Sequence, residues 1–159
     1  MAKLKVYLET SVISYLTALP SRDLIVAAHQ QITQEWWSGR DRFELLISDA
    51  VLEEIARGDQ AAARRRLDAV EGIAILSATA PAQSLAKGFL RAAAMPPKAA
   101  IDAVHVAIAA THGTDFLLTW NCTHIANAAI REKIEAVCRS AGFRSPVICT
   151  PLELMGEEE

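Results

Sequence analysis

Short apolar segments alternate along this chain with longer segments of helical periodicity, and this alternation limits the possible folds more than any other feature. The short segments are rich in Leu or β-branched residues and are bounded by residues that break regular structure. The predicted strands are residues 3–8, 43–48, 72–77, 115–120 and 146–150. The predicted helices are residues 24–37, 50–57, 60–70, 81–94, 99–112 and 125–141. Such alternation predicts an α/β fold with a mainly parallel sheet and helices on both faces.

The length of the chain fits one domain with a core of its own, since it has 159 residues. Apolar residues make up 52% of the chain but aromatic residues only 6%, so the core is expected to consist mainly of Ala, Leu, Ile and Val. Residues 95–98 (MPPK) are a predicted loop between two helices. We expect a single domain over residues 1–155 and an acidic tail at 156–159.

The cysteines indicate a reducing environment. Cys122, Cys138 and Cys149 are odd in number, far apart and not arranged in a C-x-x-C or Cys/His zinc pattern. We interpret them as reduced thiols of a cytoplasmic protein. No apolar stretch approaches the roughly 20 residues that cross a bilayer, and the first residues lack the apolar core of a signal peptide. We therefore expect no association with membranes.

The charge of the chain argues against a passive nucleic-acid-binding protein. The formal net charge is −3 and the isoelectric point is about 5.8. A protein that binds nucleic acid through charge alone carries an excess of basic residues. Any polyanionic ligand must therefore be held by a local site.

Four polar residues, distant in sequence, are predicted to meet at one edge of the sheet. Glu9 directly follows the first strand, and Asn121 follows the strand at 115–120. Asp102 lies in the first turn of the helix that leads into that strand, and this turn is also at the carboxyl edge. Glu54 lies in the helix after the second strand, and we expect it, rather than Glu53, to face inward. Ligands of open α/β sheets bind beyond the carboxyl ends of the strands.

Each of these residues also has a purely structural interpretation. Asp102 could complement the dipole of its helix, an effect of about 0.3 to 1 kcal/mol. Asn121 could cap the chain after the strand, and Glu54 could be exposed on its helix. Asp102, however, is embedded in the almost wholly apolar segment IDAVHVAIAA, where an inward carboxylate needs a partner. This context favours a functional site.

Four segments of the chain contain the polar residues discussed above: YLETSVISYL, SDAVLEEI, DAVHVAIAATHG and LLTWNCTHIAN. In their order and approximate spacing they resemble the motifs of PIN-domain nucleases, particularly the VapC-type toxins of bacterial toxin–antitoxin pairs. The resemblance implies a single-domain, three-layer α/β/α sandwich with a mainly parallel sheet of four to five strands. It also implies an acidic site for Mg²⁺ or Mn²⁺, endoribonuclease activity on RNA, a homodimer and a small antitoxin partner.

The resemblance carries the family's site residues onto particular positions of this chain. Glu9 matches the first acid, Glu54 the second and Asp102 the third. Ser11 matches the small hydroxyl residue after the first acid, and Thr119 with Asn121 matches the motif after the fourth strand. The family more often has Asp at the first position and frequently Asp where this chain has Asn121. Because Asn121 has no charge, we expect one well-held ion and a weaker second metal site.

The chemistry of phosphodiester hydrolysis explains these residue types. The reaction needs an activated water and neutralisation of the charge that builds on the phosphate, and carboxylates supply both by holding a divalent cation. We assign Glu9 and Asp102 as primary metal ligands and Glu54 as a ligand or as the group that orients the water. Asn121 is an oxygen ligand or supports one. Ser11 and Thr119 would orient these groups or contact phosphate.

Other residues near these motifs have two interpretations each. His124 could contact phosphate or move a proton, but it could equally cap the following helix. His105, one turn after Asp102, could likewise be a plain packed histidine. Trp120 and the Trp36–Trp37 pair could stack on bases, although packing is the more common use.

Two other functions remain open from the sequence. The chain could be a non-catalytic PIN-like module that binds RNA or a protein, with Glu9 and Asn121 as signs of a decayed site. It could also be another metal-dependent phosphoester hydrolase. Against this second alternative, the aspartyl nucleophile expected after the first strand of the best-known such enzymes is replaced by Glu9.

Overall fold

A computed structural model of the chain, described here for residues 2–156, contains one parallel sheet. The strands are β1 (Leu4–Leu8), β2 (Phe43–Ser48), β3 (Ala74–Leu76), β4 (Phe116–Leu118) and β5 (Val147–Cys149). Their order in the sheet is β3-β2-β1-β4-β5, and every pair is parallel. The predicted α/β fold with a mainly parallel sheet is therefore confirmed.

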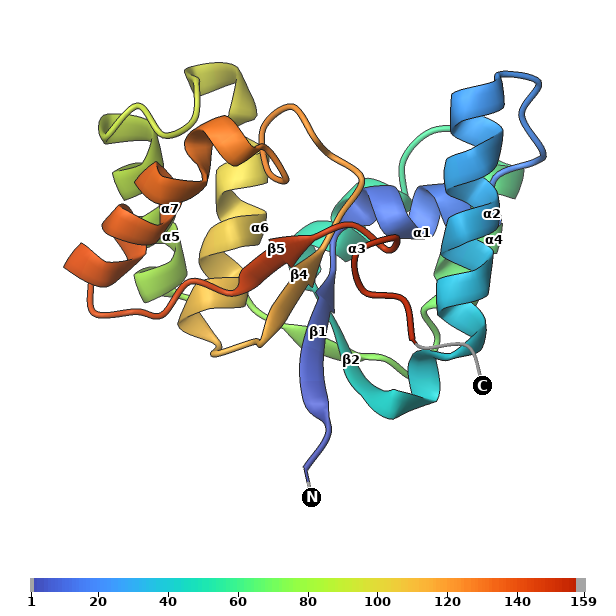
Figure 1. Cartoon of the computed structure of the whole chain (residues 1–159), viewed down its shortest axis with the longest axis horizontal. Helices are drawn as coiled ribbons and strands as arrows, with labels where there is room; N and C mark the ends of the chain where they lie inside the picture. Colours follow the sequence, from blue (N-terminus) through green and yellow to red (C-terminus); the bar gives the residue numbers. More distant parts are fainter. Residues whose placement is uncertain (1, 157–159) are drawn as a thin grey trace.

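Helices cover both faces of this sheet (Figure 1). They are α1 (Thr10–Thr17), α2 (Leu24–Ser38), α3 (Asp49–Ile55), α4 (Gln60–Ala69), α5 (Ala80–Arg91), α6 (Ala100–Thr111) and α7 (Ala128–Ser140). In Figure 1, α5, α6 and α7 lie on one side of the sheet and α1, α2 and α4 on the other. This arrangement is the three-layer sandwich that the resemblance implies.

The main difference from the prediction is α1, which the sequence interpretation did not include. Glu9 leaves β1 in an extended conformation, and its carbonyl accepts a hydrogen bond from the amide of Val12 at 3.0 Å. The helix then buries Val12 and Ile13 and ends shortly before Pro20. Val12 and Ile13 are β-branched and have a weak intrinsic preference for helix, so burial decides the conformation here.

Smaller differences concern the ends of elements. The helix predicted at 125–141 begins only at Ala128, because the side chain of Asn127 accepts a hydrogen bond from the amide of Ala129 and caps it. The predicted loop at 95–98 includes part of a short 3₁₀ helix, η2 (Pro97–Ala99), and a second one, η1 (Arg40–Arg42), precedes β2. The predicted acidic tail at 156–159 lies outside the described residues, except for Gly156.

The core is built mainly from aliphatic side chains, as the composition predicts. Val6, Leu8, Ile47, Ile108 and Leu117 are fully or almost fully buried, among many others of the same kind. Trp36 is the largest buried side chain, so it belongs to the core and cannot stack on a base. In residues 2–156, no helix has both the length and the apolar character needed to cross a membrane.

The register of β1 positions the ends of its neighbours. Tyr7 of β1 pairs with Leu46 of β2 and with Leu117 of β4. Because the strands are parallel, the residues that follow them emerge at the same edge. Glu9 therefore lies beside the start of α3 and the segment after β4.

Truncation of a central core residue should measure how far the sheet depends on this packing. Leu117 is 0% exposed, and Leu117→Ala should lower the free energy of unfolding by about 3 kcal/mol, because the cavity cannot fully collapse. The same change at Leu152, which is 58% exposed, should cost less than about 1 kcal/mol. Urea unfolding monitored by circular dichroism measures both, and equal losses would contradict the described core.

Candidate metal and active site

Glu9 is held at the carboxyl edge of β1 by two hydroxyl groups. It is the N-cap residue of α1, yet its side chain makes no capping hydrogen bond. Instead its Oε1 accepts hydrogen bonds from the hydroxyl of Ser11 and, at 2.6 Å, from that of Thr119. Ser11 also accepts the backbone amide of Trp120 at 2.8 Å, which ties α1 to the segment after β4. Glu9 is only 5% exposed, so these donors replace water around its carboxylate.

Glu54 approaches the same place from α3. Its Oε1 accepts a hydrogen bond from the hydroxyl of Thr10 at 2.7 Å and contacts Nε2 of His105. Its neighbour Glu53 points away and pairs with Arg57 on the surface, where both side chains are more than half exposed. The structure therefore turns Glu54 inward and Glu53 outward.

The environment of Glu54 favours its ionised form. Burial by itself raises the pKa of this carboxyl group, but the hydrogen bonds from His105 and Thr10 lower it, and Arg57 adds to that effect. The balance holds the pKa of Glu54 below its usual value. Glu54 is therefore a carboxylate at neutral pH even without a cation.

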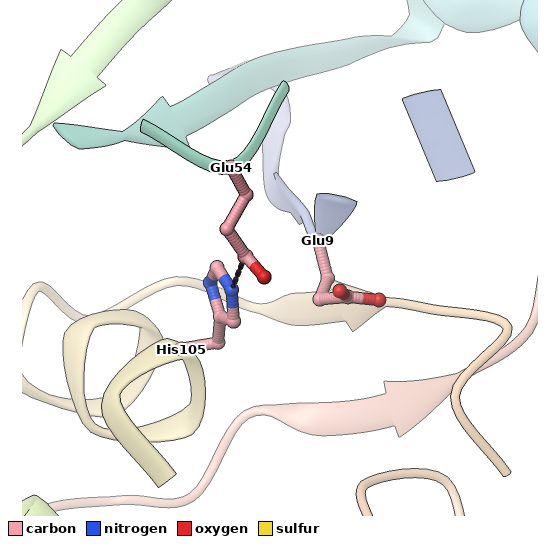
Figure 2. A group of neighbouring side chains, drawn as sticks. All are labelled: Glu9, Glu54 and His105. Carbon is pink, nitrogen blue, oxygen red and sulfur yellow. Dashed lines mark hydrogen bonds and ion pairs between the residues drawn. The ribbon is translucent and has the colours of Figure 1, made fainter. Parts of the chain in front are cut away.

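Glu9, Glu54 and His105 form one compact group (Figure 2). One potential ligand atom from each lies within 4.8 Å of the other two. Figure 2 shows Glu54 of α3 and His105 of α6 pointing toward each other, with Glu9 beside them at the end of β1. His105 is fully buried, as expected for a packed histidine, but its Nε2 faces the acids. Its position one helical turn after Asp102 is the signal in the sequence that could have placed it in the site.

Asp102 lies one turn before His105 on α6 and is half-buried. It is not a member of the compact group of Glu9, Glu54 and His105. Burial raises the pKa of Asp102, while Asn121 and the nearby His105 and His124 lower it in part and Glu54 raises it further. The net effect raises the pKa of Asp102, whereas the pKa of Glu54 is lowered.

Asn121 lies beside Asp102 but its amide oxygen already has a partner. That oxygen accepts a hydrogen bond from the backbone amide of His124 at 3.0 Å, and the backbone amide of Asn121 donates to the hydroxyl of Thr119 at 2.9 Å. Asn121 therefore shapes the turn after β4, as its structural interpretation predicts. This use of the oxygen favours a supporting role over direct metal binding.

The donor groups suit a divalent cation. Carboxylate oxygens are the ligands preferred by Mg²⁺ and Mn²⁺, and imidazole nitrogen is a common ligand of transition metals. Two carboxylates about 5 Å apart repel each other by roughly 3 kcal/mol at an effective dielectric constant of about 20. A cation between Glu9 and Glu54 would remove this repulsion, with Asp102 near enough to interact electrostatically with Glu54.

Trp120 is packed rather than free. Its ring stacks on His29 of α2 with the centroids 4.0 Å apart, and Tyr15 contacts it edge-on. The indole N–H donates to Thr33 at 2.7 Å. These contacts explain the position of Trp120 without a bound base.

One comparison with known proteins shows a family, and another shows related folds. The sequence model of the PIN domain matches residues 6–122. A comparison with curated proteins finds no match. Among solved structures, the chain is similar to the toxin VapC20 of Mycobacterium tuberculosis, which is described as cleaving the sarcin–ricin loop. The TM-score is 0.59 and the identity 16%, and the match covers 75% of this chain and 92% of that one. VapBC2 of Rickettsia felis, bound to a DNA fragment from its promoter, is also similar, with a TM-score of 0.56 and 13% identity. The match covers 92% of this chain and 98% of that one.

The raised pKa of Asp102 predicts an effect on stability. A pKa that is higher in the folded than in the unfolded chain means that the ionised group destabilises the fold above that pKa. In EDTA at pH 7.5, Asp102→Asn should therefore raise the melting temperature, by up to about 3 °C. The gain should disappear as the pH falls through the pKa of Asp102, where the wild-type carboxyl becomes neutral. Thermal unfolding at pH 7.5 and pH 4 measures this, and a less stable variant at pH 7.5 would contradict it.

Proposed function

This chain belongs to the PIN-domain family, and on that basis we propose that it is a metal-dependent endoribonuclease that hydrolyses RNA phosphodiester bonds. The observation that carries the proposal is the meeting of two buried or half-buried acids, Glu9 and Glu54, at the carboxyl edge of the sheet, with Asp102 beside them. A purely structural role would not require like charges to gather at one place.

Each residue of the site would have a defined task. Glu9 and Asp102 would hold Mg²⁺ or Mn²⁺, and Glu54 would complete the ligand set or orient the attacking water. The bound cation would supply charge neutralisation at the phosphate and lower the pKa of a water. Ser11 and Thr119 would fix the orientation of Glu9 through the hydrogen bonds described above. Asn121 would support Asp102, and His124 would face the phosphate.

We further propose that the enzyme is the toxin of a toxin–antitoxin pair, acts as a homodimer and works in the cytoplasm. VapC20, which shares the fold, is described as a toxin that cleaves the sarcin–ricin loop, and VapBC2 is described as bound to a DNA fragment from its promoter. The exposed apolar side chains of Leu19, Leu24 and Ile25, each at least 70% exposed, support a protein partner beside α2. An adjacent reading frame that encodes a small protein with a DNA-binding N-terminal half would support the proposal of an antitoxin partner.

Cleavage of structured RNA tests the enzymatic part of the proposal. With Mg²⁺ or Mn²⁺ the wild-type protein should cut, and EDTA should abolish cutting. Asp102→Asn and Glu54→Gln should each lower the rate by about 100-fold or more, because each removes a carboxylate from the metal site. Glu53→Gln is the matched control, since it makes the same change one residue away on the exposed side of α3, and it should cut at the wild-type rate.

The two alternative functions predict different results in the same assay. A non-catalytic module would show no cleavage and no rise in melting temperature on addition of metal. Another phosphoester hydrolase would turn over a generic phosphomonoester but leave RNA intact. If Asp102→Asn cuts RNA as fast as the wild type, the proposed site is wrong.

A further inference from the structure

A buried chain of hydrogen bonds leads from β2 through β1 and α6 to Glu54. The hydroxyl oxygen of Tyr7 lies 2.7 Å from that of Ser48 and 2.7 Å from Nδ1 of His105. The other ring nitrogen of His105, Nε2, contacts Oε1 of Glu54. Tyr7, Ser48 and His105 are each 0% exposed, so no water replaces these partners. None of these hydrogen bonds involves Glu9 or Asp102.

One placement of the protons satisfies the whole chain. The Ser48 oxygen accepts the amide of Val51 at 3.2 Å, and its own proton is free to be donated to Tyr7. Tyr7 then donates to Nδ1 of His105, and Nε2–H donates to Glu54. If Nδ1 of a neutral ring carried the hydrogen instead, it would donate to Tyr7. The lone pair of Nε2 would then face a carboxylate oxygen of Glu54, and these two acceptors would repel each other. Nε2 therefore carries a hydrogen.

We propose that His105 is a positioning residue that holds the Glu54 carboxylate for metal binding and does not itself bind the metal. This inference rests on the proposed metal-dependent function. His105 belongs to the compact group of potential ligands, but a nitrogen that carries a hydrogen has no lone pair for a cation. The hydrogen bond from Nε2 of His105 instead holds the Glu54 carboxylate near Glu9.

The position of Glu54 needs such support. Its side chain has three rotatable bonds, and the charges of Glu9 and Asp102 would drive it away from the site. His105 from α6 and Thr10 from α1 both donate to Oε1, so the second oxygen is left for the cation. Groups that orient metal ligands in this way commonly change metal affinity by about 10- to 100-fold. We expect His105 to act on the metal through Glu54 alone.

Two substitutions separate positioning from direct binding. In His105→Gln the amide N–H can replace the Nε2 donor, whereas His105→Leu removes the donor and keeps the apolar bulk. Isothermal titration with Mn²⁺ should show affinity within about threefold of the wild type for the Gln variant and a loss of about tenfold or more for the Leu variant. Equal large losses in both variants, each folded by circular dichroism, would overturn the proposal and make His105 a ligand.

The wild-type protein provides a test that does not depend on how the variants fold. Nitrogen-15 spectra of the histidine rings distinguish the Nε2–H from the Nδ1–H form. His105 should be Nε2–H in EDTA and should remain so in saturating Mg²⁺. An Nδ1–H ring, or loss of the Nε2 hydrogen when Mg²⁺ is added, would overturn the proposal.

Tyr7→Phe tests the remote end of the chain. It removes the hydrogen bond to Nδ1 without touching Glu54, which still keeps the hydrogen on Nε2. The Nδ1 signal should therefore shift, the ring should be held less firmly, and Mn²⁺ affinity should fall by severalfold. Unchanged ring spectra and affinity would contradict the role of Tyr7. If the wild type binds no Mn²⁺ at all, the proposed function fails. If the wild type and the folded His105→Leu variant bind Mn²⁺ equally well, only the role of His105 fails.

Discussion

The parallel pairing of β1 with both β2 and β4 is the constraint on which the site depends. Strands that run in the same direction end at the same edge, so the residues after β1 and β4 and the helix after β2 are brought together there. The same pairing places Tyr7 within reach of Ser48 at the end of β2. A shift of register by one residue would turn Tyr7 and its neighbours to the opposite face and remove both the core and the site.

The acids gathered at this edge are stabilised by unequal means. Glu9 accepts two hydroxyl groups, and Glu54 accepts Thr10 and His105. The charge of Asp102 is stabilised less well, because burial raises its pKa by more than its polar neighbours lower it. Its ionised form would therefore gain more from a nearby cation than that of Glu54. This asymmetry fits a site in which two acids are held in place beforehand and the third responds to the metal.

The replacement of a fourth acid by Asn121 has a structural counterpart. The amide oxygen of Asn121 accepts the backbone of His124, which an aspartate could also do, but the amide adds no further negative charge beside Asp102. The site thus contains fewer repelling charges than one with four acids. If the proposed function holds, such a site would also have less capacity for a second cation, which would then depend more on the phosphate of the substrate.

The sequence by itself determined the strands, six of the helices, and the edge at which Glu9, Asp102 and Asn121 meet, because these follow from local periodicity and from the parallel topology it requires. Only the tertiary structure decided α1, whose Val12 and Ile13 become helical through burial. It also decided that His105 contacts Glu54. Most of α6 is buried, so its sequence has no polar face to show which way each side chain points. Packing of α6 against Tyr7 and Glu54 supplies that direction.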